Sequence, residues 1–361
     1  MTRPAIPALE TPALVVDLDA FERNLTKMDA WFADRTCKLR PHAKTHKCTE
    51  VARRQVDLGA IGITCAKLGE AEAMAKGGIN DILIANQVVG AAKLRRLAIL
   101  AGRGRLTVAV DDLGNARQIA RAAREAGSTV GVLIEVDTGM GRCGVPPDPE
   151  TVVRYAKELS GILGLEFRGL MGYEGHAVLV EDATERRAKA EAAARQLVQC
   201  AGWVREAGLE VGIVSGGGTG TYDVTSQVEG ITEIQAGSYV FMDARYHRVR
   251  PEFENALFVA ATVISRPTPD RVILDAGLKS ITQEFGLPEA VGCPGLEVAS
   301  LSEEHVRCSA SGAAGELKLG DQVWLLPSHC CTTVNLHDRY WCVRGEKLVE
   351  TWPIEARGKC A

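Results

Sequence analysis

One segment near the start of the chain gathers basic side chains. Residues 40–47, RPHAKTHK, place Lys44 among His42, His46 and Lys47, directly after a predicted strand. Neighbouring positive charges disfavour the ammonium form of a lysine, which lowers its pKa and frees an amine for attack on a carbonyl. A solvated basic turn is the alternative explanation. Lys44 is therefore a candidate for Schiff-base chemistry.

Two later segments are rich in phosphate-binding groups. SGGGTG, residues 215–220, follows one predicted strand, and QAGSY, residues 235–239, follows the next. Consecutive glycines leave backbone N–H groups accessible, so such loops can bind a phosphate. The candidate phosphate-binding residues are Gly217, Gly218, Thr219, Gly220, Gly237 and Ser238. Neither segment has the glycine pattern of a dinucleotide or P-loop site, and plain tight turns are the alternative.

A third glycine-rich turn, DTGMGRCG at residues 137–144, contains Arg142. Its planar guanidinium is always charged and can donate to a phenolate or a carboxylate. A surface arginine after a strand is the alternative.

The segment PSHCCTTVNLHD, residues 327–338, pairs an imidazole with a thiol. His329 and Cys331 lie two residues apart, so in an extended strand both side chains leave the same face. An imidazole and a thiolate suit Zn²⁺ better than Mg²⁺ or Ca²⁺. Two ligands leave positions open for water and substrate, as a catalytic metal requires. Two ordinary core residues are the alternative.

The elements that position these residues follow a regular pattern. From residue 36 to about 240, β-branched runs alternate with Ala-rich amphipathic segments such as 68–78 and 183–208. The predicted strands are 37–42, 61–66, 81–86, 106–110, 130–137, 167–173, 212–216 and 231–237. Eight such units favour an α/β fold closed into a (β/α)8 barrel of the TIM type over an open doubly wound sheet. The carboxyl ends of barrel strands carry the chemistry, and most of the motifs above fall there.

The pattern changes after Arg250. Runs at 256–266, 270–277, 321–327, 339–344 and 346–356 predict strands without helices between them. We therefore predict a C-terminal β-rich domain over 251–361, which carries the metal ligands, after a barrel over 19–250. Residues 1–18 contain an early strand that we expect to pack on the C-terminal domain.

Composition narrows the class of protein. A formal net charge of −4 gives no support for nucleic-acid binding. The chain contains no apolar run that could span a bilayer and no signal-peptide pattern at its start. The 11 cysteines are scattered without a CxxC pair, which is typical of a reduced protein. We expect a cytoplasmic protein that binds neither nucleic acid nor membrane.

Together these segments resemble the D-threonine aldolase and D-serine dehydratase family, fold-type III pyridoxal-phosphate enzymes that share their barrel with alanine racemase. The resemblance runs from TPALVVDLDAFERNL to ETWPIEARG and is most specific in RPHAKTHK, DTGMGRCGV, SGGGTGTYD, EIQAGSYVFMD, DAGLKS and PSHCCTTVNLHD. It implies pyridoxal 5'-phosphate on Lys44, a divalent metal (Zn²⁺, Mn²⁺ or Mg²⁺) on His329 and Cys331, and a homodimer. The other implied cofactor-binding residues are His42, Arg142 at the phenolic oxygen, Tyr173 and Tyr246 in the pocket, Gln235, and the phosphate-binding residues above.

Departures from the family pattern bear on the reaction. Gln235 stands where alanine racemases place an arginine at the pyridine nitrogen, and a neutral partner makes the ring a weaker electron sink. This argues against racemisation. The segment HCC resembles dehydratases in its HxC, whereas TVNLHD resembles aldolases. Some aldolases carry a histidine six residues beyond the pocket tyrosine; that position is Leu179 here. His176 is the candidate catalytic base instead, and a metal-bound hydroxide is the alternative.

The leading hypothesis is an aldolase that cleaves D-configured β-hydroxy amino acids of the D-threonine type to glycine and an aldehyde. The alternative is a dehydratase of D-serine or D-3-hydroxyaspartate that gives a keto acid and ammonia. A non-catalytic pyridoxal-phosphate protein and a metal-dependent barrel hydrolase are two further alternatives. A preference for D-3-hydroxyaspartate would follow if Arg245 or Arg248 paired with its second carboxylate; a basic loop between the domains is the alternative for these arginines.

Overall fold

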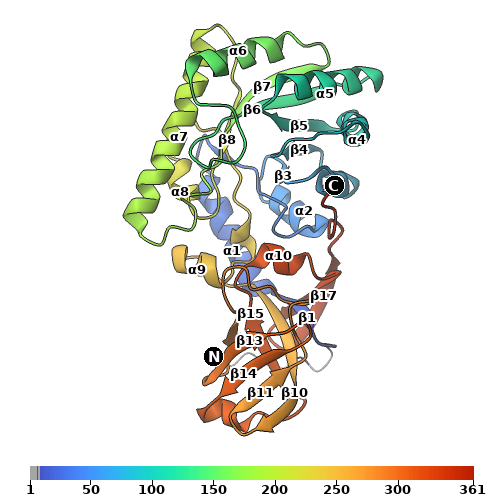
Figure 1. The fold of residues 1–361 in the computed structure, drawn as a ribbon, viewed down its shortest axis with the longest axis vertical. Coiled ribbons are helices and arrows are strands. Elements are labelled where there is room, and N and C mark those ends of the chain that lie inside the picture. Colours follow the sequence, from blue (N-terminus) through green and yellow to red (C-terminus); the bar gives the residue numbers. More distant parts are fainter. Residues whose placement is uncertain (1–5, 7–8) are drawn as a thin grey trace. The chain divides into compact units, whose positions relative to one another are not determined.

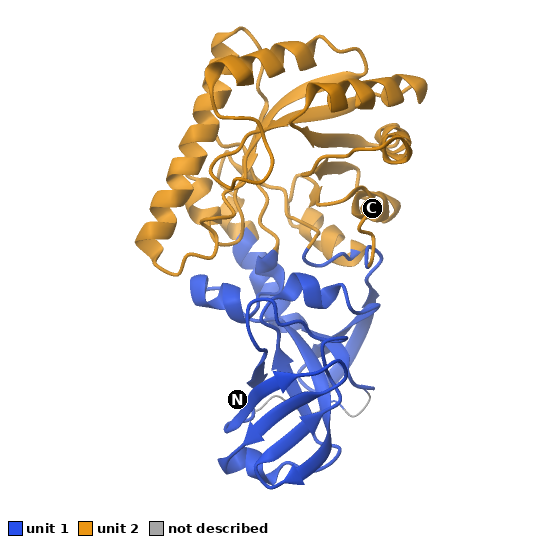
Figure 2. Ribbon diagram, viewed as in Figure 1, with its two compact units in different colours: residues 1–28, 45–48, 238–357 blue, residues 29–44, 49–237, 358–361 orange. Residues whose placement is uncertain are grey.

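The computed structural model describes residue 6 and residues 9–361, which form two compact units (Figure 2). Unit 1 comprises residues 1–28, 45–48 and 238–357, apart from the undescribed ones. Unit 2 comprises 29–44, 49–237 and 358–361. The chain thus passes between the units near residue 237, whereas we predicted a domain boundary at 250. The predicted domains, 1–18, 19–250 and 251–361, stay a prediction.

Unit 2 contains the expected barrel. Its eight parallel strands are hydrogen-bonded in the order β2-β9-β8-β7-β6-β5-β4-β3. They are β2 (Lys38–Leu39), β3 (Ile63–Cys65), β4 (Asp81–Ile84), β5 (Arg105–Val110), β6 (Val130–Glu135), β7 (Leu165–Met171), β8 (Ile213–Gly216) and β9 (Glu233–Ile234). Each falls within or overlaps a predicted run, so the α/β barrel class is confirmed.

Helices follow the strands and lie around the outside of the barrel (Figure 1). They are α2 (Thr49–Asp57), α3 (Leu68–Lys76), α4 (Ala91–Ala101), α5 (Leu113–Glu125), α6 (Pro149–Ser160), α7 (Ala183–Glu206) and the short α8 (Tyr222–Thr225). Every residue of β6 is buried, as expected for a strand covered on both faces.

The barrel closes beside the candidate lysine. His42 forms a parallel bridge with Thr64, which follows Ile63 in β3. The Thr64 N–H donates to the Pro41 carbonyl at 2.8 Å, and the Ala43 N–H donates to the Thr64 carbonyl at 2.7 Å. This closure fixes the backbone immediately before Lys44.

Unit 1 is built on a nine-stranded sheet with the main order β13-β14-β11-β10-β1-β16-β17, in which β15 pairs with β10 and β12. Its strands are β1 (Ala13–Asp17), β10 (Leu257–Thr268), β11 (Arg271–Leu274), β12 (Glu289–Val291), β13 (Leu296–Leu301), β14 (Val306–Ala310), β15 (Gln322–Leu326), β16 (Arg339–Arg344) and β17 (Lys347–Pro353). The early strand β1 pairs antiparallel with β10 and parallel with β16. The C-terminal β-rich fold is confirmed, while β12 to β14 lie outside the predicted runs.

Two short helices interrupt unit 1 where we predicted none. They are α9 (Ala244–Val249), which contains most of the basic segment ARYHRVR, and α10 (Cys330–Val334). The two elements are joined by a hydrogen bond from the Ala244 N–H to the Pro327 carbonyl at 3.1 Å. The first helix, α1 (Leu18–Phe32), follows β1. Among the described residues, no helix combines the length and hydropathy needed to cross a membrane.

Candidate active site

Tyr173 is the common neighbour of the candidate cofactor residues in unit 2. The Nζ atom of Lys44 lies 5.7 Å from the centre of the Tyr173 ring, and the Arg142 guanidinium lies 5.6 Å from it. On the glycine-rich loop, a Cβ atom added at Gly218 would lie 3.4 Å from the Tyr173 ring. The barrel therefore brings together four residues from four strand ends, and an aromatic ring with basic groups around it fits a flat, anionic cofactor.

His42 shapes the turn that carries the lysine. Its ring nitrogen Nδ1 accepts a hydrogen bond from the Lys44 N–H at 3.3 Å. Its own N–H donates to the Ala236 carbonyl at 3.1 Å, which links this turn to the end of the last barrel strand. His42 is buried, and its hydrogen bond with the Lys44 N–H supports the position of Lys44.

The glycine-rich loop is tied to a buried carboxylate, Glu174, which follows Tyr173. Its oxygens accept hydrogen bonds from the Gly217 N–H at 3.1 Å and from the Thr221 and Thr225 hydroxyls at 2.7 and 2.6 Å. The Gly218 N–H donates to the Thr221 hydroxyl oxygen at 3.2 Å. The N–H groups of Gly217 and Gly218 therefore have acceptors within this region, and phosphate binding by these two glycines stays a prediction.

Glycines are nevertheless required in this loop. Gly217 has a positive φ of 74°, and a Cβ atom at Gly220 would lie 1.8 Å from the Val178 carbonyl oxygen. Both positions therefore exclude other residues for steric reasons. Phosphate binding by Thr219, Gly220, Gly237 and Ser238 likewise stays a prediction.

Gln235 lies at the end of the last barrel strand, as expected. Its amide Nε2 donates to the Ser215 hydroxyl at 2.8 Å, which fixes the orientation of the carboxamide. A carboxamide is neutral, so Gln235 can donate a hydrogen bond to a ring nitrogen without placing a positive charge beside it.

His176 lies three residues beyond Tyr173, on the segment that follows β7. It is exposed and lines a groove of about 920 Å³ beside α7, together with Thr138, Arg195 and Gln196. Its ring packs against Gly139, where an added Cβ atom would lie 3.1 Å from the ring. The catalytic role of His176 stays a hypothesis.

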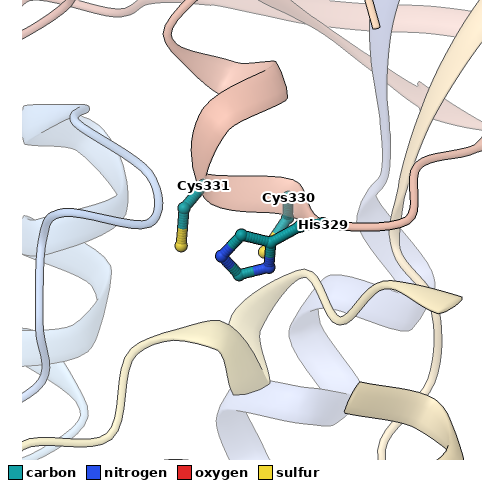
Figure 3. Close-up of side chains that lie close together, drawn as sticks. All are labelled: His329, Cys330 and Cys331. Atoms are coloured by element: carbon teal, nitrogen blue, oxygen red, sulfur yellow. The ribbon is translucent and has the colours of Figure 1, made fainter. Parts of the chain in front are cut away.

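The candidate metal ligands lie at the start of α10 in unit 1 (Figure 3). His329 has extended backbone geometry and precedes the helix, whereas Cys330 and Cys331 form its first residues. The expected extended strand is therefore wrong, because the chain turns into a helix after His329. The ligand atoms of the three residues still lie within 4.8 Å of one another. The Cys331 Sγ atom also lies 3.3 Å from the Thr45 hydroxyl.

Electrostatics distinguish the members of this group. Burial by itself lowers the pKa of His329, but the neighbouring Cys331 thiol and the Asp243 carboxylate raise it to about 10. Burial raises the pKa of the Cys330 thiol well above its usual value. Cys330 is therefore the residue least suited to supply a thiolate, and His329 with Cys331 is the ligand pair that fits a soft or borderline divalent metal.

Sequence patterns missed two carboxylates, Glu174 and Asp243. Asp243 is fully buried, and its Oδ2 atom lies 2.8 Å from His329 Nδ1. Asp243 precedes α9 and accepts a hydrogen bond from the Tyr246 N–H, so an aspartate before a short helical run was the available signal. Glu174 offered no comparable signal, since a single acid after a tyrosine has no pattern.

Two protein-family models match the chain in succession. The alanine racemase N-terminal domain matches residues 16–245, and the putative serine dehydratase domain matches residues 256–343. The chain belongs to the family that combines an alanine racemase N-terminal domain with a serine dehydratase domain. Membership places it among the fold-type III pyridoxal-phosphate proteins, which agrees with the residues gathered around Tyr173.

Individual relatives cover nearly the whole chain. The sequence is 44% identical to a D-threonine aldolase of Arthrobacter sp. over 354 residues, 97% of this chain and 93% of the relative. It is 39% identical to a 3-hydroxy-D-aspartate aldolase of Paracoccus denitrificans over 99% of this chain and 95% of the relative.

Two solved structures agree with these relatives. The crystal structure of D-threonine aldolase from Filomicrobium marinum matches with a TM-score of 0.95 and 40% identity, over 100% of this chain and 99% of that one. A cysteine-to-alanine variant of D-threo-3-hydroxyaspartate dehydratase in a metal-free form matches with a TM-score of 0.85 and 31% identity, over 97% of this chain and 99% of that one.

Proposed function

We propose that the protein is a pyridoxal-phosphate- and divalent-metal-dependent aldolase that cleaves β-hydroxy D-amino acids of the D-threonine type to glycine and an aldehyde. The observation that carries the proposal is the combination of a lysine, an arginine and a glycine loop around Tyr173 with an imidazole–thiol pair at α10. The full-length similarity to D-threonine aldolases supports the reaction and the substrate class.

The barrel residues would hold the cofactor. Lys44 would provide the amine that attaches it, and Arg142 would donate to its phenolic oxygen. Thr219, Gly220, Gly237 and Ser238 would bind its phosphate, while Tyr173 would support its ring. When bound, pyridoxal phosphate supplies an electron-accepting ring that makes bonds at the α-carbon of an amino acid breakable. Gln235, held by Ser215, would keep the ring nitrogen uncharged.

His329 and Cys331 would hold the divalent metal. Such an ion supplies a Lewis acid that lowers the pKa of a hydroxyl group on the substrate. A dehydratase relative was solved in a form described as metal-free, which supports metal dependence of this protein together with the His329–Cys331 group. Thr45, which follows Lys44 directly in the chain, contacts Cys331.

His176 is the proposed proton acceptor for the β-hydroxyl group. An imidazole can accept a proton, but it must come within about 3 Å of the hydroxyl to act. Its exposed position beside Gly139 makes this the first role to be tested by substitution.

The deciding experiment identifies the products. The purified protein, loaded with pyridoxal phosphate and Mn²⁺ or Zn²⁺, is incubated with D-threonine, D-phenylserine or D-serine. We expect glycine and an aldehyde from the first two, and L-threonine is the matched control that should not react. A keto acid and ammonia as the main products would show a dehydratase instead.

The dehydratase of D-3-hydroxyaspartate or D-serine is the second candidate function. The thiol of Cys331 favours it, because the HxC pattern of His329 and Cys331 resembles the dehydratases. The same product assay separates this candidate from the aldolase. We further propose a cytoplasmic homodimer, which is consistent with eleven free cysteines.

A further inference from the structure

Asp243 is a buried carboxylate to which the proposed function gives no role. Its Oδ1 atom accepts the Tyr246 N–H at 2.7 Å. Its Oδ2 atom accepts the Cys330 N–H at 3.0 Å and lies 2.8 Å from His329 Nδ1. A single side chain therefore holds the start of α9, the start of α10 and the ring of His329.

The contact at Nδ1 decides which nitrogen of His329 can bind a metal. An ionised carboxylate has no proton to give, so Nδ1 must be the donor. In the neutral imidazole the proton then lies on Nδ1, and Nε2 keeps its lone pair. Nε2, the nitrogen further from the point of attachment of the ring, faces the Cys331 sulphur in Figure 3.

The surroundings restrict rotation of the same ring. The Phe285 ring lies 4.9 Å from the His329 ring, centre to centre, and the Tyr246 ring lies 6.2 Å from it. Met242, directly before Asp243, has a φ of 54° in the left-handed region, where non-glycine residues are uncommon. Such a conformation costs free energy and is kept where the surrounding structure determines it.

We propose that Asp243 is the positioning residue of the metal site: it holds His329 in the tautomer that presents Nε2 beside Cys331. The inference rests on the proposed metal-binding role of His329 and Cys331. It adds a residue that is 86 positions from His329 in the sequence and does not itself bind the ion.

Asp243→Asn is the informative substitution because the two side chains have nearly the same shape. A carboxamide has only one acceptor oxygen, whereas both oxygens of Asp243 accept hydrogen bonds. If the amide nitrogen faces His329, Nδ1 must accept and the proton moves to Nε2, which then cannot bind a metal. If it faces Tyr246 instead, the amide nitrogen meets the N–H group at the start of α9.

The test measures Zn²⁺ affinity in the full-length protein loaded with pyridoxal phosphate and stripped of metal, by competition with a chromogenic chelator. We expect Asp243→Asn to bind Zn²⁺ roughly 10- to 100-fold more weakly than the unaltered protein. The cofactor absorbance should not change. The matched control is Asp112→Asn, since Asp112 only caps α5 through the Asn115 N–H and should leave Zn²⁺ affinity unchanged.

A second measurement does not depend on the folding of a variant. Nitrogen-15 NMR of the histidines in the unaltered protein with Zn²⁺ should show His329 protonated at Nδ1 and metal-bound at Nε2. Zn²⁺ bound at Nδ1, or equal Zn²⁺ affinities of Asp243→Asn and the unaltered protein, would overturn the role of Asp243 and leave the proposed function standing. Absence of Zn²⁺ binding by the unaltered protein would instead overturn the metal part of the proposed function, and this inference with it.

Discussion

Glu174 in the barrel and Asp243 before α9 are both buried carboxylates, but they organise different things. Glu174 accepts hydrogen bonds from one backbone N–H and two threonine hydroxyls, so it fixes the path of a loop. Asp243 binds two backbone N–H groups and an imidazole, so it fixes a side chain and its proton. The barrel carboxylate thus holds only groups of its own region's loop and helix α8, whereas the carboxylate before α9 also holds a candidate metal ligand.

The largest expected effect lies in the barrel region, at Lys44. Lys44→Ala removes the amine that would hold the cofactor, so the absorbance of the protein-linked cofactor should disappear. Activity should fall by about 1000-fold or more, as for other groups that react covalently. Spectra before and after borohydride reduction check this, with Lys47→Ala as the control. A linkage that survives in Lys44→Ala would move the assignment to Lys47 or Lys67.

A smaller effect, in the other region, is expected from Cys331→Asp. Exchange of a thiolate for a carboxylate changes a soft ligand into a hard one. We expect the ratio of Zn²⁺ to Mn²⁺ affinity to fall by roughly tenfold or more, while the cofactor absorbance stays unchanged. Competition titrations with both ions measure the ratio, and Cys330→Ser is the neighbouring control. An unchanged ratio would remove Cys331 from the metal site.

Glu174→Gln tests the role of the buried carboxylate in the barrel. Both threonine hydroxyls donate to Oε1 of Glu174 and the Gly217 N–H donates to Oε2. A carboxamide oxygen can keep only one of these two sets, and its NH₂ group then faces the Gly217 N–H or the two hydroxyls. Loss of such buried hydrogen bonds costs about 1–3 kcal/mol. We expect a lower melting temperature and weaker cofactor binding with no change in Zn²⁺ affinity. If Zn²⁺ affinity falls as much as in Asp243→Asn, the two carboxylates do not have separate tasks.

The smallest effect is expected at Arg248, on the exposed side of α9. This side chain is 59% exposed and lies 3.6 Å from Glu289, an ion pair worth about 0–1 kcal/mol. Arg248→Ala should therefore change kcat/KM equally for D-threonine and D-3-hydroxyaspartate. Arg245→Ala is the comparison: it should lower kcat/KM for D-3-hydroxyaspartate alone if Arg245 meets the second carboxylate. A selective loss in Arg248→Ala would contradict the placement of Arg248.

The barrel was predictable because its strands are buried on both faces and therefore form nearly continuous β-branched runs, as in β6. Since function concentrates at the ends of such strands, Lys44, Arg142 and Tyr173 could be selected from the sequence. Strands β12 and β13 lie at edges of the sheet and are short and partly exposed, which weakens the alternation that marks a strand. β14 lies inside the sheet but has only five residues.

Parts of the site depend on contacts that local patterns do not contain. The hydrogen bond between Asp243 and His329 joins residues 86 positions apart, and no local pattern announces it. The N–H groups of Gly217 and Gly218 looked available in the sequence but are taken by Glu174 and Thr221. Glycine patterns show where a loop can bend closely; they do not show which of its donors are already used.

The pairing of β1 also limits the order in which this chain can fold during synthesis. β1 lies near the start of the chain, yet its partners are β10 and β16, which begin at Leu257 and Arg339. During synthesis on a ribosome, the backbone N–H and C=O groups of β1 have no strand to pair with until most of the chain has emerged. The barrel strands, by contrast, pair mostly with their neighbours in the sequence and can assemble early. A nascent chain halted before residue 339 would therefore carry a nearly finished barrel and an incomplete sheet, a natural substrate for chaperones.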